Sequence, residues 1–450
     1  MASAALSTPP TWRGSPLHNT NHTAADANVR EYVIQEILAI ETRVDRLLPF
    51  SSTMTMVPAA GVPTKALALI ETQQRSARKR LREAGRQFLR WLESTEGKNA
   101  DAAKIQGRLV VLKLRFNAVL AQFDIFADVL VQRSESGNGV WIAGLDDLAA
   151  DSLRLAGSFY ETPELICYLD RGHGAAIRRA RTEWPGGDEN PVAIIKIPRE
   201  RMVGLGIGAS LVHEVGHQAA AILNLVPPLI ASLRKESLSW QGMERNVWNY
   251  WERWMSEIVA DMWSLGQLGI TATYGLMGVV SLPRFFMFQI DSEGPHPFPW
   301  IRVMISIELG RALYPNTQWD RVEAMWRSMY PANGLDGRVS EVIASLNKTR
   351  ARCAAILLQH RPSLLNGLSV GECFQRQGHS PELLRSIWRK CHNQRAKWND
   401  LRPTLALAAI GQARVDGKTS PADEARTISG LLRHWAIKSS LSRSQPLVPF

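Results

Sequence analysis

Cysteine is scarce in this chain, because its 450 residues include four cysteines and no two of them form a Cys-x-x-Cys pair. That spacing argues against a structural zinc knuckle, and so few thiols in a long chain do not indicate a disulfide scaffold. A reducing compartment therefore fits the composition best. A signal peptide is missing as well, since the first 19 residues have no apolar core.

Long apolar runs are also absent. The most apolar stretch, from Gly269 to Ile290, is interrupted by Pro283 and Arg284, which is typical of a buried helix and turn. It does not have the uninterrupted length that a membrane span requires. We therefore expect a soluble, cytoplasmic protein with no membrane span, and leave export by a route without a cleavable signal as an open alternative.

Basic residues outnumber acidic ones, which gives a net charge of +11. Such a charge can attract nucleic acid, but no recognised nucleic-acid module accompanies it here. We therefore favour an unspecialised basic surface and expect no nucleic-acid partner. The chain also has 15 tryptophans, whose rings need an apolar environment. That number argues for a folded core of normal size.

The hydrophobic pattern predicts the α+β class, predominantly α, with a small β-sheet. Helical spacing is expected over residues 31–48, 65–94, 102–132, 204–225 and 242–266. Residues 164–169 and 192–197 have the composition of strands, and 175–182 is a weaker strand candidate because it is rich in arginine. A turn is expected at Pro185–Asp188.

These elements suggest four regions along the chain. We predict a disordered segment over 1–30, a helical domain over 31–140, a mixed domain over 141–345 and a helical region over 346–450. The first prediction rests on a composition rich in Ser, Thr, Pro, Asn and Ala. The two helical regions are candidates for contact with a protein partner.

The most informative motif is His-Glu-x-x-His, formed by His213, Glu214 and His217 on a predicted helix. Residues four apart lie on one helix face, so both imidazoles can reach one metal ion, with Glu214 close enough to act as a base. The flanking residues are largely apolar, so the helix should be buried, and buried His and Glu side chains need partners. Gly216 in the same helix would allow another element to approach closely.

A third metal ligand has to come from another part of the chain. Glu257 and Asp261 are also four apart on an apolar predicted helix, where unpartnered carboxylates are costly to bury. We expect Glu257 to bind the metal and Asp261 to accept the free N–H of a ligating histidine. The alternative is an ordinary polar stripe that pairs with Arg245 or Arg253.

His213-Glu-x-x-His217 followed by Glu257-x-x-Ala-Asp261 resembles the gluzincin-type zinc metallopeptidases, and is closest to soluble relatives of the CAAX-processing metalloproteases. The resemblance covers about residues 160 to 310. It implies a zincin-like core within 141–345 and one bound Zn²⁺. That group often has His-Pro followed by Arg, so His296 and Arg302 would stabilise the oxyanion or position the substrate. The alternative for His296 is a helix cap.

A strand that precedes the metal helix has a further expected role. In zincins an edge strand at this place pairs with the substrate backbone, which assigns substrate binding to Ile194, Ile195 and Lys196. The alternative is a plain core strand.

The expected activity is zinc-dependent hydrolysis of a peptide or protein substrate. Glu214 would take a proton from water held at the metal and pass it to the leaving amine. The competing hypothesis is a non-enzymatic structural or docking protein that retains a metallopeptidase fold. The presence of Glu214, which a structural zinc site does not need, argues mildly for the enzyme.

Overall fold

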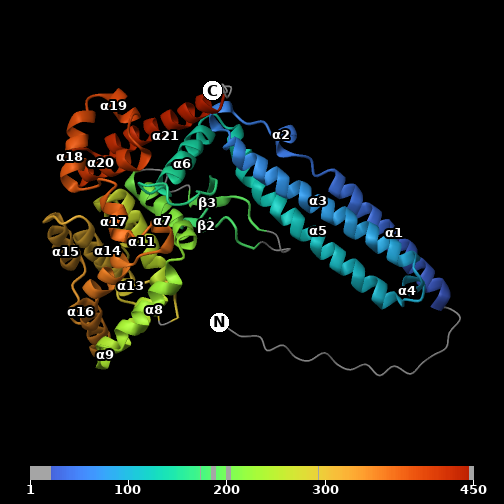
Figure 1. Cartoon of the computed structure of the whole chain (residues 1–450), viewed down its shortest axis with the longest axis horizontal. Coiled ribbons are helices and arrows are strands. Elements are labelled where there is room, and N and C mark those ends of the chain that lie inside the picture. Colours follow the sequence, from blue (N-terminus) through green and yellow to red (C-terminus); the bar gives the residue numbers. More distant parts are fainter. Residues whose placement is uncertain (1–21, 173, 184–188, 199–203, 292, 445–450) are drawn as a thin grey trace. The chain divides into compact units, whose positions relative to one another are not determined.

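The computed structural model describes residues 22–172, 174–183, 189–198, 204–291 and 293–444 (Figure 1). The turn expected at Pro185–Asp188 lies outside these residues. Contacts divide the chain into two compact units, one made of residues 1–48 and 74–121 and the other of residues 49–73 and 122–450. The division differs from the expected regions, because residues 49–73 and 122–140 group with the larger unit and no unit boundary falls at 345.

Helices that run nearly their full length along one another build the smaller unit. It contains α1 (His22–Asp45), α4 (Thr95–Lys98) and most of α3 (Thr64–Glu93) and α5 (Ala102–Val131). Its core is formed by apolar residues at helical spacing, which include Val33, Ile37, Phe88, Leu109 and Leu112.

The expectation of disorder up to residue 30 is wrong for residues 22–30, because α1 begins at His22. Two contacts stabilise this first part of the helix. Val29 packs against the apolar core of the smaller unit. The Arg30 guanidinium donates hydrogen bonds to the carbonyl oxygens of Gly97, Lys98 and Ala100 at 2.6, 2.9 and 3.2 Å. These carbonyls belong to a helix end, where acceptors need partners.

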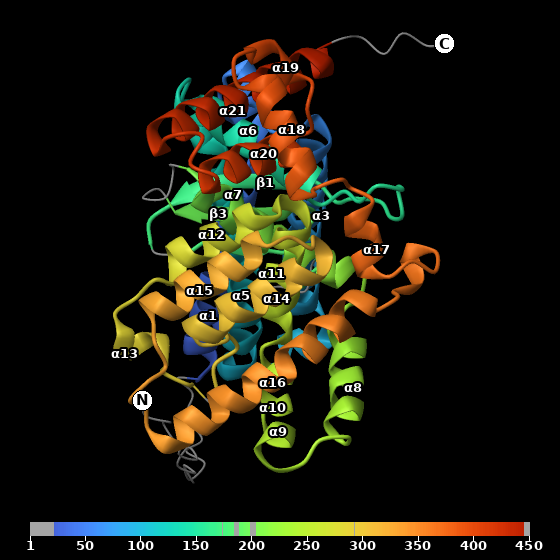
Figure 2. The same ribbon diagram turned by 90° about the vertical axis from the view of Figure 1, so that its left-hand side faces the viewer.

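The larger unit is mainly helical. Its central helices are α7 (Leu205–Ile222), α11 (Met255–Leu268), α12 (Ile270–Val280), α14 (Pro299–Leu313) and α20 (Pro403–Val415), which pack against one another (Figure 2). The other elements are α2 (Phe50–Thr53), η1 (Pro58–Ala60), η2 (Gln132–Ser134), α6 (Asn138–Ser152), α8 (Val226–Ser237), α9 (Gly242–Asn246), α10 (Trp248–Arg253), α13 (Arg284–Met287), α15 (Gln318–Met329), α16 (Gly337–Gln359), η4 (Ser363–Leu365), α17 (Val370–Gln375), α18 (Pro381–Cys391), α19 (Arg395–Asn399) and α21 (Pro421–Ser444).

The single helix expected over 242–266 is divided into α9, α10 and α11. Tight turns separate these helices, since the amides of Tyr250 and Glu257 bond to carbonyls three residues earlier, at Val247 and Trp254. Side chains three apart eclipse one another in such turns. The indoles at 248, 251 and 254 are all fully buried.

Burial of the tryptophan rings agrees with the sequence. Among the tryptophans that the structure describes, seven are fully buried in the larger unit: Trp248, Trp251, Trp254, Trp263, Trp300, Trp319 and Trp326. The four cysteines are buried and none forms a disulfide. None of the described helices has both the length and the apolar character needed to cross a bilayer.

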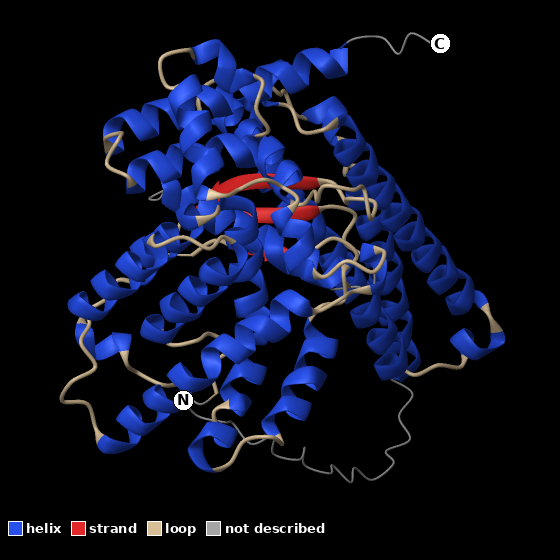
Figure 3. Ribbon diagram, turned by 60° about the vertical axis from the view of Figure 1, so that its left-hand side comes forward, coloured by secondary structure: helices blue, strands red, loops and turns tan. Residues whose placement is uncertain are grey.

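The described sheet of the larger unit has three strands in the order β1-β3-β2. Figure 3 shows its strands in red among the helices. β1 (Leu165–Asp170) pairs in parallel with β3 (Ala193–Pro198), and β2 (Ala176–Arg178) pairs with β3 in the antiparallel direction. Side chains on β3 alternate between two apolar clusters, with Ile195 in one and Ile194 in the other. The predominantly α fold with a small mixed sheet confirms the predicted class.

The expectation that Ile194, Ile195 and Lys196 form an edge strand is wrong. All three have a partner on β1 and another on β2, so their backbone cannot pair with a substrate as well. The edge strands are β1 and β2, and β2 lies in the arginine-rich segment that the sequence marked only weakly as a strand. Exposed charged residues are typical of a strand that borders solvent.

α7 and α11 cross closely at Gly216. A Cβ atom at this position would lie 2.8 Å from the Ala260 Cα and 2.9 Å from the Trp263 Cβ, so no larger residue fits without a shift. The glycine therefore sets how near the metal-motif helix comes to the helix that carries Glu257.

Replacement of Gly216 by alanine should destabilise the protein by about 1–3 kcal/mol, because it overpacks a helix crossing. Gly206 in the same helix is the matched control, since a Cβ there meets no atom within 4 Å. Gly206→Ala should leave stability unchanged or raise it by up to about 1 kcal/mol through helix propensity. Denaturant unfolding of both variants measures the difference, and equal stability would contradict the close crossing.

Candidate metal centre

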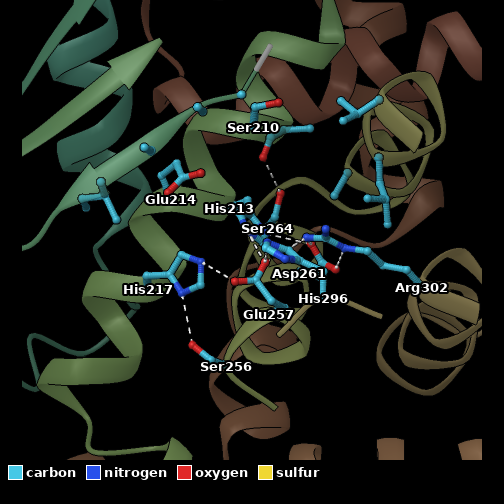
Figure 4. A pocket seen from close by; sticks show the side chains of 18 of the residues that line it. Ser210, His213, Glu214, His217, Ser256, Glu257, Asp261, Ser264, His296 and Arg302 are labelled. Atoms are coloured by element: carbon cyan, nitrogen blue, oxygen red, sulfur yellow. Dashed lines mark hydrogen bonds and ion pairs between the residues drawn. The ribbon is translucent and has the colours of Figure 1, made fainter. Parts of the chain in front are cut away.

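His213 and His217 lie one turn apart on α7. Their ring centroids are 4.9 Å apart with an interplanar angle of 88°. Leu211, Val212 and Val215 on the other faces of the helix are fully buried, so packing fixes the direction in which the imidazoles point. Figure 4 shows both rings on the side of α7 that faces α11.

Glu257 on α11 meets both rings. One carboxylate oxygen lies 3.4 Å from the His213 Nε2, and the other lies 3.4 Å from the His217 Nε2. Zinc bonds of about 2.1 Å in a tetrahedral arrangement place neighbouring ligand atoms roughly 3.4 Å apart. The side chains of His213, His217 and Glu257 therefore fit a shared metal ion, and all three ligand atoms lie within 4.8 Å of one another.

Asp261 fixes the orientation of the first imidazole. The His213 Nδ1–H donates to an Asp261 carboxylate oxygen at 2.7 Å, which leaves Nε2 as the nitrogen that faces Glu257. A histidine held in this way presents one defined nitrogen to a metal and gains basicity. The structure therefore contains the contact between Asp261 and a histidine N–H that the sequence predicted.

Arg302 on α14 is the cation between the two carboxylates of α11. Its Nε and Nη2 donate to Asp261 at 2.6 and 2.9 Å, and Nη2 also lies 3.4 Å from a Glu257 oxygen. The alternative partners considered for these carboxylates, Arg245 and Arg253, do not contact them; Arg253 lies 3.4 Å from Glu293 instead. Arg302 therefore contacts the carboxylates directly.

His296 approaches the centre from the loop before α14. Its Nε2 lies 3.4 Å from a Glu257 oxygen, and its side chain is 60% exposed. It does not cap α14, because the N-cap is Phe298 and no side chain caps that helix end. Of the two residues expected near an oxyanion, His296 is the one open to solvent, whereas Arg302 is held by Asp261.

A cavity of about 520 Å³ opens beside these side chains. Glu214 forms part of its wall together with both histidines (Figure 4). Segment 174–179, which includes the edge strand β2, forms another part. The Gln218 side chain accepts a hydrogen bond from the Ala180 amide at 2.9 Å and so connects this segment to α7.

Sequence reasoning missed several residues of this cavity. Leu276 and Val279 of α12 line it, and nothing distinguishes them in the sequence from ordinary core residues. Ser256 also lines it, with its Oγ 3.5 Å from the His217 Nδ1. The sequence feature that could have pointed to Ser256 is its position directly before Glu257, in the first turn of α11.

The ionisable groups influence one another strongly because they share a buried site. Burial lowers the pKa of His213, but the Asp261 and Glu257 carboxylates outweigh it and raise that pKa to about 9. Burial and the charge on His213 lower the pKa of His217 to about 4. Burial raises the pKa of Glu214 above its usual value. For Glu257 the effect of burial is outweighed by His213, which lowers the pKa.

Comparison of the chain with protein-family models, curated proteins and solved structures finds no match. The function is therefore inferred from the residues described above.

Loss of Glu257 should weaken metal binding more than loss of Asp261. An outer partner of a metal ligand typically contributes about 10–100-fold in affinity, and Asp261→Asn should fall in that range. Glu257→Ala removes a ligand and should exceed it. Zinc titration of the purified variants gives both affinities. Glu293→Ala is the control, because that side chain is 85% exposed and outside the site. Unchanged zinc affinity in Glu257→Ala would show that another group is the third ligand.

Zinc affinity should also depend on pH. Since the pKa of His213 is raised to about 9, the metal-free site holds a proton there at pH 7, and a metal must displace it. Affinity should therefore rise about tenfold per pH unit below that pKa and level off above it. His217, with a pKa lowered to about 4, is already neutral at pH 7 and adds nothing to the slope there.

Calorimetric titration with zinc between pH 6 and pH 8 checks this dependence. In Asp261→Asn the carboxylate that raises the pKa is gone, so fewer protons should be released at pH 7. The same proton release in wild type and variant would contradict the assignment of the proton to His213.

Proposed function

We propose that this protein is a zinc-dependent peptidase with one ion held by His213, His217 and Glu257. One observation carries the proposal: the three side chains converge at the separation of zinc ligands, on the wall of a cavity that also contains Glu214. Two imidazole nitrogens and one carboxylate oxygen form a donor set used by catalytic zinc, with a coordination position left for water.

When bound, zinc would polarise a substrate carbonyl and lower the pKa of water toward neutrality. The donor set supports zinc over magnesium or calcium, which prefer oxygen ligands. The bond from His213 to Asp261 supports the same choice, because it directs the other ring nitrogen toward Glu257, where zinc would take the place of the proton on that nitrogen.

Glu214 is the proposed general base. The residue is buried, with 9% of its surface exposed, and burial raises its pKa, which favours a carboxylate that both takes and returns a proton. It would accept a proton from the attacking water and then donate it to the amine that leaves. The Ile177 backbone on β2 also hydrogen-bonds Glu214, so the base is held beside the edge strand.

The edge strand favours an extended peptide as substrate. β2 uses one edge to pair with β3, and in the described part of the chain no strand pairs with its other edge. Residues 174–177 also line the cavity. An extended backbone could add to this edge and so bring a peptide carbonyl to the metal centre. We therefore assign substrate binding to β2 and no longer to Ile194–Lys196, because those residues are paired on both sides.

His296 and Arg302 have different proposed roles. His296 is exposed next to Glu257 and could donate a hydrogen bond to an oxyanion. Arg302 neutralises Asp261 and Glu257 and so holds both carboxylates in place.

Glu214→Gln should abolish hydrolysis and keep zinc. Removal of a general base costs about 10²–10⁴-fold in rate, while the metal ligands are untouched. The assay is cleavage of a mixed peptide library followed by mass spectrometry, with zinc content measured on the same samples. Glu161→Gln, at a side chain that is 75% exposed, is the matched control and should keep full activity.

Two results would contradict the proposal. Undiminished cleavage by Glu214→Gln would remove the general-base role. A wild-type protein that holds one zinc ion per chain but cleaves no peptide, with or without chelator, would instead favour a docking protein that retains the metal site.

A further inference from the structure

A second cavity lies between α15, α18 and the residues that follow α20, and it shares no lining residue with the metal centre. Its volume is about 750 Å³. Side chains connect its walls, since Asn316 donates to Glu382 at 2.7 Å and Arg385 donates to Gln318 at 3.3 Å. Small-molecule sites usually enclose about 300–1,000 Å³, so this cavity could hold a ligand of ordinary size.

Positive charge dominates the lining of this cavity. Arg321, Arg385, Arg389 and Lys418 all contribute, and they come from α15, from α18 and from the residues that follow α20. Asp416 is the acidic residue of the lining, and two hydrogen bonds of 2.8 and 3.1 Å already pair it with Arg385.

The remaining three cations have no carboxylate partner within the residues that the structure describes. Arg389 instead donates from Nε to the backbone carbonyl of Arg385 at 3.4 Å. The nearby carboxylate of Glu382 accepts from Asn316. Like charges around one concave surface repel one another and attract an anion. A bound anion would therefore supply the negative charge that these three cations lack.

Two buried amides contact lining residues of the cavity, Gln318 at Arg385 and Gln412 at Asp416. Gln318 and Gln412 are 2% and 0% exposed. The Gln412 amide donates to the Gln318 carbonyl oxygen at 2.9 Å and to Asp416 at 3.2 Å. The contacts of Arg385 with Asp416 and Gln318 therefore order this wall of the cavity without a ligand.

One wall of the cavity is aromatic. Trp388 and His392 stack with ring centroids 5.6 Å apart and an interplanar angle of 19°. Together with the cations, this wall suits a molecule that has both anionic groups and an organic part. Guanidinium groups bind phosphate oxygens through paired N–H donors. The spread of the four cations over three segments favours more than one phosphate.

We propose that this cavity binds a small ligand with two or more phosphate groups, which contact Arg321, Arg389 and Lys418. Inorganic polyphosphate and nucleoside polyphosphates both have such linked phosphate groups. The proposal does not depend on the metal centre or on peptidase activity.

Calorimetric titration of the full chain with phosphate, tripolyphosphate and ATP tests the proposal. A chelator and constant ionic strength keep the ligands from binding through a metal or through general screening. We expect tripolyphosphate, ATP or both to bind with at least about tenfold higher affinity than phosphate. Tighter binding of ATP than of tripolyphosphate would identify the nucleotide as the source, and the reverse would identify the inorganic chain.

The variant Arg389→Gln and its neighbour Lys390→Gln provide the matched comparison. Both residues are exposed on α18 and both changes remove one positive charge, but Lys390 does not line the cavity. Arg389→Gln should weaken polyphosphate binding about tenfold, and Lys390→Gln should change it less than about twofold. Equal losses in the two variants would show diffuse attraction to a basic surface. Equal, weak binding of all three ligands would also overturn the proposal.

Discussion

The close crossing of α7 and α11 is the constraint on which the site depends. Gly216 allows the two helices to approach until a Cβ would lie 2.8 Å from the Ala260 backbone. That approach brings the His213 and His217 nitrogens within 3.4 Å of the Glu257 oxygens. α7 alone supplies two imidazoles, and the crossing adds the Glu257 carboxylate as the third group that could bind a metal. Packing of the flanking apolar residues, together with the glycine, fixes the crossing.

The same crossing places several ionisable groups in a buried space, where each needs a partner. Asp261 is matched by His213 and Arg302, and Glu257 by both histidines and Arg302. Removal of one member from a buried set of charges leaves the others uncompensated, which costs several kcal/mol. Burial also raises the pKa of Glu214, which suits the general-base role proposed for it.

The sequence predicted local features better than pairing between distant segments. The i, i+4 spacing of His213 and His217, and that of Glu257 and Asp261, indicated which side chains share a helix face, and the two pairs do meet. By contrast, Ile194–Lys196 were expected at an edge, although an unbroken apolar strand is typical of one buried on both faces. The order β1-β3-β2 depends on long-range contacts that no local pattern specifies. The position of Arg302 between the carboxylates likewise arises only when α14 packs on α11.

The basic cavity shows a different limit of sequence reasoning. Its cations come from residues 321 to 418 and are separated by helices with no shared motif. In the sequence they are indistinguishable from the general basic surface, and only the fold collects them around one space.

The central claim is that α7 and α11 hold one zinc ion between them. X-ray diffraction from zinc-loaded crystals, with anomalous data at the zinc edge, tests it most directly. We expect a single anomalous peak about 2.0–2.2 Å from the Nε2 atoms of His213 and His217 and from a Glu257 oxygen. A zinc peak bound elsewhere, with those three side chains free of metal, would contradict the account.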